Sequence, residues 1–313
     1  MGNLTQNDIT RVKGLGFLWN RGTESFSGRV LPGNGVISAE GMKKVAECAE
    51  KFGAGNVTMT SRLALEIPGI PYENIEPARA FMAEAGLEFG GTGAKIRPVT
   101  SCKGTTCVFG NFDTQTLAQE IHEKYYKGWF DVKLPHKFKI AVGGCPNSCM
   151  KPSLNDFGVE GRRTPRIHLD KCRSCSTCLV EKHCPIHVAK KGEDGKIVIN
   201  PDTCNSCGVC SSGKCPFGAV EKHEDVKYQI YVGGTWGKKT RMGTALSRFV
   251  EEKEIFPLLE KTMLWFKENG YQKERLGAVI DRIGVEKMEA ALFGDDLLNR
   301  KEEILAAPIK ERP

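Results

Sequence analysis

The chain has 313 residues and a formal net charge of +7; hydrophobic and charged residues make up 40% and 27% of it. These values are typical of a globular protein with two or three compact units, and they exclude a largely disordered chain. No stretch is apolar enough for a membrane span and the N-terminus is polar, so we expect a cytoplasmic protein without a signal peptide. No basic run with interleaved aromatic residues indicates nucleic-acid binding, and the positive charge suits anionic ligands instead.

The first ninety residues predict an α+β unit in which strands and helices alternate. Ser38 is a suitable N-cap for a first helix, and a second helix is expected to begin near Pro77. Between them, residues 57–67 alternate apolar and polar side chains, which predicts one strand with Arg62 on its second face.

The next segment predicts a helix and a strand, each close to a pair of cysteines. Asp113 is a suitable N-cap for a helix that ends near residue 126. Residues 137–142 alternate cleanly, which predicts a strand with Lys137 and Lys139 on the same side.

The thirteen cysteines indicate bound metal. Their odd number argues against a closed disulfide framework, and twelve fall in short-spaced groups, as expected for ligands in a reducing compartment. Cys48 stands alone on a predicted helix, where we expect a buried apolar residue. Two glycine-rich turns carry the pairs Cys102/Cys107 and Cys145/Cys149, and four thiolates in two such turns suit a 4Fe–4S cluster. Zinc is the alternative for the pairs alone.

Residues 166–222 contain an internal repeat of about 32 residues. Each copy has three cysteines at Cys-x2-Cys-x2-Cys spacing and a later Cys-Pro, the pattern of a bacterial-type ferredoxin with two clusters. In both copies the gap before the last cysteine is longer than in the usual pattern. By the crossover rule of such ferredoxins, one cluster takes Cys172, Cys175, Cys178 and Cys215, and the other takes Cys204, Cys207, Cys210 and Cys184. Structural zinc is the less favoured alternative.

The last ninety residues predict one more strand followed by helices. Residues 228–234 form the strand and its turn, and a basic loop with Lys238, Lys239 and Arg241 follows. Helices are expected over 244–269 with a break at Pro257, and near 271–282 and 285–305. Because this strand follows the cysteine repeat, we expect the ferredoxin unit to be inserted within a domain.

The motifs together resemble the siroheme-dependent sulfite and nitrite reductases. The resemblance rests on Arg29-Val-Leu-Pro-Gly-Asn-Gly, Thr58-Met-Thr-Ser-Arg62, Arg97-Pro-Val, Leu134-Pro-His-Lys-Phe-Lys139, Gly144-Cys-Pro-Asn-Ser-Cys149 and Tyr231-Val-Gly-Gly234. Two departures are that the Arg29 motif is displaced by one residue and that four residues, not five, separate Cys102 from Cys107.

The resemblance implies siroheme and three 4Fe–4S clusters as cofactors. It implies that sulfite or nitrite is bound by Arg29, Arg97, Lys137 and Lys139. It implies siroheme contacts from Arg62, Asn147, Lys238, Lys239 and Arg241, with Cys149 as the thiolate shared between the siroheme iron and the cluster of Cys102, Cys107 and Cys145.

The resemblance also implies a domain plan. A ferredoxin-like half domain would span residues 1–90, a siroheme and 4Fe–4S domain 91–165 and 223–313, and the inserted two-cluster ferredoxin 166–222. This plan is similar to that of dissimilatory-type subunits and of the small anaerobic sulfite reductase subunit. Since only one copy of the α+β repeat is present, we expect a homodimer or a related partner chain.

The implied activity is six-electron reduction of sulfite to sulfide, with reduction of nitrite to ammonia as the nearest variant. A different class of function is a non-catalytic electron-transfer subunit in which the siroheme pocket has degenerated. No flavin or nicotinamide motif is present, so electrons would come from a ferredoxin or a flavin-containing subunit.

Overall fold

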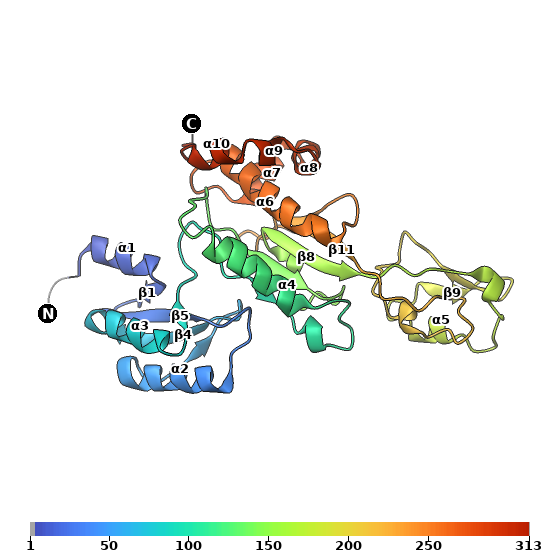
Figure 1. Ribbon diagram of the computed structural model, residues 1–313, viewed down its shortest axis with the longest axis horizontal. Coiled ribbons are helices and arrows are strands. Elements are labelled where there is room, and N and C mark those ends of the chain that lie inside the picture. The colour runs from blue at the N-terminus through green and yellow to red at the C-terminus, as the bar shows by residue number, and fades with distance from the viewer. Residues whose placement is uncertain (1–3, 313) are drawn as a thin grey trace.

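A computed structural model describes residues 4–312 of the chain. Three regions follow one another along the longest axis of the molecule: an N-terminal unit, a central sheet with its helices, and a cysteine-rich lobe (Figure 1). The mixture of helices and strands confirms the expected α+β class. Within residues 4–312, no helix combines the length and the apolar character needed to cross a membrane.

The N-terminal unit is an antiparallel sheet with helices packed on it. The strands pair in the order β1-β2-β4-β3, and β5 also pairs with β2. Its elements are α1 (Gln6–Gly14), β1 (Phe17–Trp19), β2 (Ser25–Leu31), α2 (Ala39–Phe52), β3 (Thr58–Met59), β4 (Leu65–Pro71), α3 (Ile75–Ala83) and β5 (Glu88–Phe89). Cys48 is fully buried in this core, as expected, beside Val45 and Ile67. The Ser38 hydroxyl accepts a hydrogen bond from Gly41 N at 3.0 Å, which confirms it as the N-cap of α2.

The single strand expected over 57–67 is wrong, because the chain turns back on itself there. Residues 60–64 form a turn between β3 and β4. The Thr60 hydroxyl accepts hydrogen bonds from the backbone of Arg62 at 3.3 Å and of Ala64 at 3.1 Å, and Leu63 has a positive φ of 59°. A hydroxyl that bonds nearby backbone in this way stabilises a turn. Arg62 therefore lies at a hairpin tip, not on a strand face.

The central region is a mixed sheet covered by helices. Strands pair in the order β12-β11-β8-β7-β6, parallel between β6, β7 and β8 and antiparallel elsewhere. Its elements are β6 (Thr100–Ser101), α4 (Thr114–Ile121), β7 (Ile140–Gly143), β8 (Phe157–Arg162), β11 (Lys227–Val232), β12 (Thr244–Ala245), α6 (Glu252–Asn269), α7 (Leu276–Ile283), α8 (Val285–Phe293), α9 (Asp296–Asn299) and α10 (Lys301–Ala306). Helix α4 packs against β6 and β7, and α6 packs against β8 and β11.

Most elements expected in this region are present with shifted boundaries. Asp113 caps α4, which continues as a π-helical turn over His122–Lys127. Strand β7 begins only at Ile140, but Phe138 already pairs with Ile96 and is buried. The helix expected from residue 244 is wrong, because residues 244–245 pair with β11. The break at Pro257 is also wrong: α6 continues through this residue, although proline in the second turn removes one backbone hydrogen bond of the helix.

The cysteine-rich lobe is the chain segment that connects β8 to β11, two neighbouring strands of the central sheet. The chain leaves the sheet after β8 and returns as β11, the antiparallel partner of β8 (Figure 1). The lobe contains α5 (Leu179–His183), β9 (Ala189–Lys191) and β10 (Ile197–Ile199). Its hydrophobic core is small and consists of Val180, Ala189, Ile197, Ile199 and Val220, with cysteines packed against it. Such a core gives the lobe little stability of its own, so whatever its thiols bind contributes to its folding.

Candidate functional site

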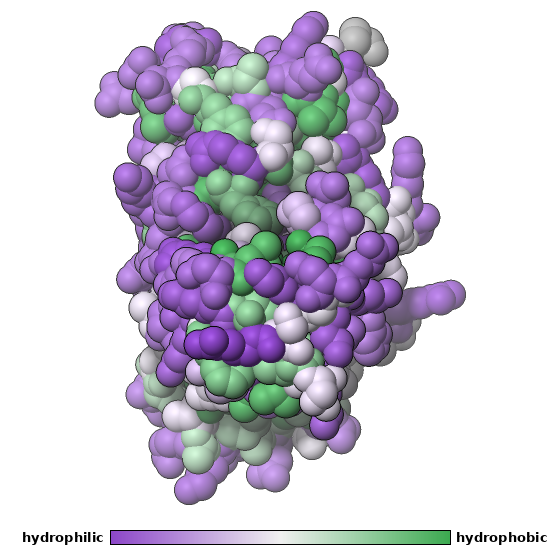
Figure 2. Space-filling model, turned by 90° about the vertical axis from the view of Figure 1, so that its right-hand side faces the viewer, coloured by the Kyte–Doolittle hydropathy of each residue, from purple (hydrophilic) through white to green (hydrophobic). Residues whose placement is uncertain are grey.

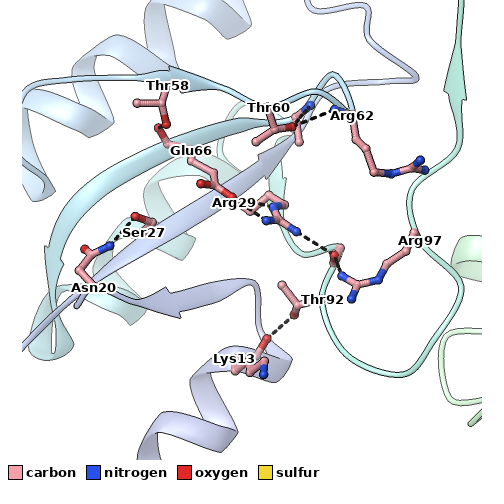
Figure 3. Close-up of polar contacts among 12 residues, drawn as sticks. Lys13, Asn20, Ser27, Arg29, Thr58, Thr60, Arg62, Glu66, Thr92 and Arg97 are labelled. Atoms are coloured by element: carbon pink, nitrogen blue, oxygen red, sulfur yellow. Dashed lines mark hydrogen bonds and ion pairs between the residues drawn. The ribbon is translucent and has the colours of Figure 1, made fainter. Parts of the chain in front are cut away.

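A cationic pocket lies where the N-terminal unit meets the central sheet. Its volume is about 330 Å³. The cations that line it are Lys13, Arg29, Arg62, Arg97, Lys137 and Lys139. All four residues expected to bind the substrate anion therefore line one cavity, together with Arg62. Figure 3 shows Arg29, Arg62 and Arg97 reaching this region from a strand, a hairpin turn and a loop.

Sequence reasoning missed Lys13, because helix α1 was not expected. The signal was present: the Thr5 hydroxyl accepts a hydrogen bond from Asp8 N at 3.2 Å, and the Asp8 side chain accepts one from Thr5 N at 3.1 Å. This capping box begins α1 and brings Lys13, near its last turn, to the pocket. The Lys13 carbonyl accepts a hydrogen bond from the Thr92 hydroxyl, which fixes the end of the helix (Figure 3).

Arg29 is held in place by a carboxylate on the adjacent strand. Its Nε and Nη2 atoms donate to Glu66 Oε1 at 2.9 and 2.6 Å, across a register pair of β2 and β4. Its Nη1 donates to the Gly91 carbonyl at 3.2 Å, and that carbonyl also accepts a hydrogen bond from Arg97 Nη1. Glu66 thus neutralises one cation, and the shared Gly91 carbonyl sets two guanidinium groups side by side.

Burial lowers the pKa of four of the cations that line the pocket. Burial, together with the neighbouring guanidinium groups, lowers the pKa of Arg62 and of Arg97 to about 10. The same causes lower the pKa of Lys139 to about 8, with Arg62 and Arg275 as the neighbouring charges of largest effect, and they also lower the pKa of Lys137. At neutral pH all these groups remain charged, and Lys139 is the one most ready to release a proton.

The pocket contains an unsatisfied donor that an anion would satisfy. Among residues 4–312, Arg97 Nε is one of the buried side-chain nitrogens without a hydrogen-bond partner. A buried donor left unpaired costs on the order of 1–3 kcal/mol. An acidic ligand with several carboxylates, or a small oxyanion, would neutralise the clustered charge and accept such bonds. The residues present therefore fit siroheme, a polycarboxylate, and its anionic substrate.

A buried ion pair fixes the segment that carries Lys139. Asp156 is fully buried; it accepts a hydrogen bond from Lys139 N at 2.8 Å and hydrogen bonds from Arg275 Nη2 at 2.9 and 3.0 Å. Arg275 immediately precedes α7, 119 residues away in the chain from Asp156. Sequence reasoning missed this pair because no local pattern connects its members.

The first four cysteines lie around a second pocket. Cys102, Cys107, Cys145 and Cys149 line a cavity of about 730 Å³, together with Asn147. All of them are free thiols, and Cys149 is the exposed one. Within residues 4–312, no three His, Cys, Asp or Glu side chains come close enough together to hold a single metal ion. The four thiols instead surround a wider space, which fits a cluster.

Glycines let the turn with Cys102 and Cys107 fold tightly and pack against the turn with Cys145 and Cys149. A Cβ on Gly110 would overlap the carbonyl oxygen of Gly104. A Cβ on Gly144 would lie 3.1 Å from Gly104 Cα, and Gly144 N donates to Cys102 Sγ at 3.2 Å. This contact holds the sulfur of Cys102 close to the turn that carries Cys145 and Cys149.

One set of lobe cysteines lies together as the crossover pattern predicts. Cys184, Cys204, Cys207 and Cys210 line a common small cavity. Burial raises the pKa of Cys210 to about 11 and also raises the pKa of Cys207. Protonated thiols of this kind have to lose their protons when they bind metal.

The two halves of the lobe repeat the same local structure around their Cys-Pro cysteines. Burial would raise the pKa of Cys184 and of Cys215, but four backbone N–H groups lower both pKa values below the usual one. The donors lie two to five residues after each cysteine: Ile186, His187, Val188 and Ala189 in one half, Phe217, Gly218, Ala219 and Val220 in the other. The set Cys172, Cys175, Cys178 and Cys215 stays a prediction.

The structure does not bring the basic loop to the cationic pocket. Lys238 and Lys239 are exposed, and neither they nor Arg241 line the cationic pocket or the pocket of the first four cysteines. Arg241 Nη2 donates to Asp281 Oδ1 at 2.8 Å, and Nη1 donates to the Gly233 carbonyl at 3.2 Å. In this structure Arg241 fastens the loop to α7.

Comparison with known proteins identifies the family. The model of the nitrite and sulphite reductase 4Fe-4S domain matches residues 92–301, and that of the nitrite/sulfite reductase ferredoxin-like half domain matches residues 20–85. The coenzyme F420-dependent sulfite reductase of Methanocaldococcus jannaschii is 31% identical over 270 residues, which are 85% of this chain but only 42% of that relative. An anaerobic sulfite reductase subunit of Salmonella typhimurium is 30% identical over 253 residues, 75% of this chain and 72% of the relative.

The fold agrees with these matches. The crystal structure of dissimilatory sulfite reductase I superposes with a TM-score of 0.69 at 22% identity, covering 86% of this chain and 69% of that one. A likeness at this identity supports the fold, and the matched domains together with the relatives support the assignment. The chain belongs to the nitrite and sulphite reductase family, a family of oxidoreductases with iron–sulfur clusters.

Proposed function

We propose that this protein reduces sulfite to sulfide, using siroheme in the cationic region and 4Fe–4S clusters held by its cysteines. The observation that carries the proposal is the gathering of Arg29, Arg97, Lys137 and Lys139 in one pocket. An electron-transfer subunit would have no use for these cations, because moving electrons requires no anion site.

The residues that would hold the cofactors are divided between the two pockets. Cys102, Cys107, Cys145 and Cys149 would bind one cluster, with Cys149 shared with the siroheme iron, and the lobe cysteines would bind two more. Arg62 and Asn147 would contact siroheme. Lys238 and Lys239, which are exposed, stay candidates for siroheme contacts, and Arg241 fixes their loop through Asp281. When bound, siroheme supplies the redox-active iron at which the anion is reduced.

The pocket residues bind the anion and deliver protons to it. Guanidinium groups have a fixed, planar set of donors, so Arg29 and Arg97 suit the orientation of an oxyanion. Arg97 Nε is already short of an acceptor. Reduction of sulfite to sulfide removes three oxygens as water and therefore consumes protons. Lys139, whose pKa burial lowers to about 8, is well suited to donate them.

The lobe would receive electrons from another protein. Its end of the molecule is mostly hydrophilic but carries separate hydrophobic patches, as Figure 2 shows. Exposed apolar side chains of the lobe include Leu179, Val198 and Phe217. Patches of this kind suit brief contact with a reduced donor such as a ferredoxin or a flavin-containing subunit. Several relatives are named as subunits, which supports a homodimer or a related partner chain.

An anaerobic turnover assay with a reduced low-potential dye tests the proposal. Sulfite and nitrite are offered separately, sulfide and ammonia are measured, and the visible spectrum is recorded. A haem-type spectrum with sulfide formation supports the proposal. Ammonia formation from nitrite without sulfide formation would favour the nitrite variant. A brown protein without a haem band or product would leave only an electron-transfer subunit.

A further inference from the structure

The lobe is fastened to the central sheet through one of its cysteine loops. Arg163 N donates to the Ser206 carbonyl at 2.7 Å, and the Thr164 hydroxyl lies 3.2 Å from the Ser206 hydroxyl. Arg162 Nη1 donates to the Asn205 carbonyl at 2.5 Å. Asn205 and Ser206 lie between the first two cysteines of the second repeat. These bonds hold that loop against the segment that follows β8.

Asn111 makes contacts on both sides of this junction. It is buried, and its backbone N–H donates to the Gly144 carbonyl at 3.0 Å, directly before Cys145. Its side-chain Nδ2 donates to the Cys207 carbonyl at 3.4 Å and to the Gly161 carbonyl at 3.3 Å. A single residue thus connects a cysteine of the central pocket to a cysteine of the lobe by two hydrogen bonds.

The junction is built so that this contact is close and fixed. Gly208 has a φ of +83°, and a Cβ there would lie 2.6 Å from Asn111 Oδ1. Arg163 Nη2 donates to the Asn111 carbonyl at 3.3 Å, and Arg163 is itself buried and paired with Glu224 at 3.2 Å. The lobe backbone can approach Asn111 this closely only because residue 208 has no side chain.

The loop that carries the other set of lobe cysteines makes its hydrogen bonds within the lobe. In the loop from Cys172 to Cys178, the Ser174 hydroxyl donates to the Asp194 carbonyl at 3.4 Å, and the Ser176 carbonyl accepts from Lys191 Nζ at 3.0 Å. These partners all belong to the lobe. The loop with Cys207, by contrast, bonds across the junction, so the Cys207 set is the one nearer the central pocket.

We propose that Asn111 is the bridge by which electrons cross from the lobe to the central cysteine pocket, and that the Cys207 set is the last lobe site before it. The inference rests on the proposed function, since it requires clusters at both sets. Tunnelling falls off steeply across empty space, so a hydrogen-bonded contact between the two cysteine loops is the favoured route. A reduced low-potential donor protein gives up one electron at a time. As the lobe site is oxidised by one electron the central site is reduced by one, and no bond of the chain is made or broken.

Rapid-freeze electron paramagnetic resonance on the holoenzyme tests this route without sulfite. The oxidised protein is mixed with reduced methyl viologen at less than one equivalent, and the signals of the lobe and central clusters are followed in time. In Asn111→Ala, the side-chain bonds to Cys207 and Gly161 are lost while the backbone bond to Gly144 remains. We expect lobe reduction at the wild-type rate, several-fold slower arrival at the central cluster, and unchanged midpoint potentials.

Two matched variants show whether slower transfer comes from loss of the Asn111 contact or from a general weakening of the junction. Thr164→Ala removes a hydrogen bond to Ser206 at the same junction without touching Asn111, and Asn200→Ala removes an exposed asparagine of the lobe. Both are expected to transfer electrons at the wild-type rate. If Asn111→Ala loses clusters, Asn111→Ser, which is too short to reach Cys207, provides the same comparison.

The outcomes distinguish this inference from the proposed function. If electrons reach the central cluster at the wild-type rate in Asn111→Ala, the proposed role of Asn111 is wrong. It is also wrong if Thr164→Ala slows this transfer as much as Asn111→Ala does. Lack of iron at the Cys207 set would overturn it too. A wild-type protein that passes electrons to the central cluster but makes no sulfide would refute the proposed function and leave the bridge standing.

Discussion

Replacing Lys139 by arginine would keep a positive charge in the cationic pocket but remove a group that releases a proton near neutral pH. Burial, then Arg62 and Arg275, lower the pKa of Lys139 from 10.5 to about 8. If Lys139 donates protons to the anion, kcat/KM falls above this pKa, by about tenfold for each further pH unit. Arginine stays protonated throughout this range and donates no proton.

The assay is the pH dependence of sulfite reduction between pH 6 and about 9, the range that brackets this pKa. We expect the wild type to lose activity with a midpoint near pH 8, and Lys139→Arg to be slower at neutral pH without that alkaline decline. Lys133→Arg, an exposed lysine in the same segment, should follow the wild type. Ionisation of sulfite itself is common to all three proteins and cancels in the comparison. An alkaline decline in Lys139→Arg identical to that of the wild type would refute the assignment of Lys139 as proton donor.

Three further changes test the supports of the two pockets and the lobe. A Cβ on Gly110 would overlap the Gly104 carbonyl oxygen within the turn that carries Cys102 and Cys107. We therefore expect Gly110→Ala to lose about 1–3 kcal/mol in unfolding free energy and to lose bound iron, whereas Gly14→Ala, with open space around it, retains both. Asp156→Asn breaks a buried ion pair and should cost about 3–5 kcal/mol in denaturant unfolding. Asp281→Asn, which breaks an exposed ion pair with Arg241, should cost below about 1 kcal/mol. Equal losses of unfolding free energy in Asp156→Asn and Asp281→Asn would contradict the burial assigned to Asp156. Removing iron by chelation should expose residues 166–222 to protease while the central sheet stays intact, because the lobe core is small; a lobe that stays resistant would show that its core suffices.

The cysteine groups could be predicted from sequence because their spacing is local. A pair or triplet within one turn lies together in space whatever the rest of the chain does. The same holds for Lys137 and Lys139, which alternate with Phe138 so that burial of the phenylalanine directs both lysines to one side. Ser38 and Asp113 likewise act on backbone groups only three residues away.

The parts that sequence reasoning missed depend on contacts between distant segments. Arg62 was expected on a strand face, yet it reaches the pocket from a turn closed by Thr60. Arg275 meets Asp156 across 119 residues, and Asn111 meets Cys207 across 96. No periodicity or spacing connects such pairs, because sheet order and the position of the lobe decide them. The contact of Arg241 with Asp281 is another of these long-range pairs, and the siroheme contacts expected of its loop stay a prediction.

The number of electrons consumed for each sulfide released tests the central claim most directly. The holoenzyme is given a known amount of reduced dye and excess sulfite under anaerobic conditions, and dye oxidised and sulfide formed are measured in the same sample. Complete reduction of sulfite to sulfide predicts six electrons for each sulfide. Dye oxidation without sulfide, or no dye oxidation by protein that holds both siroheme and clusters, would contradict the account.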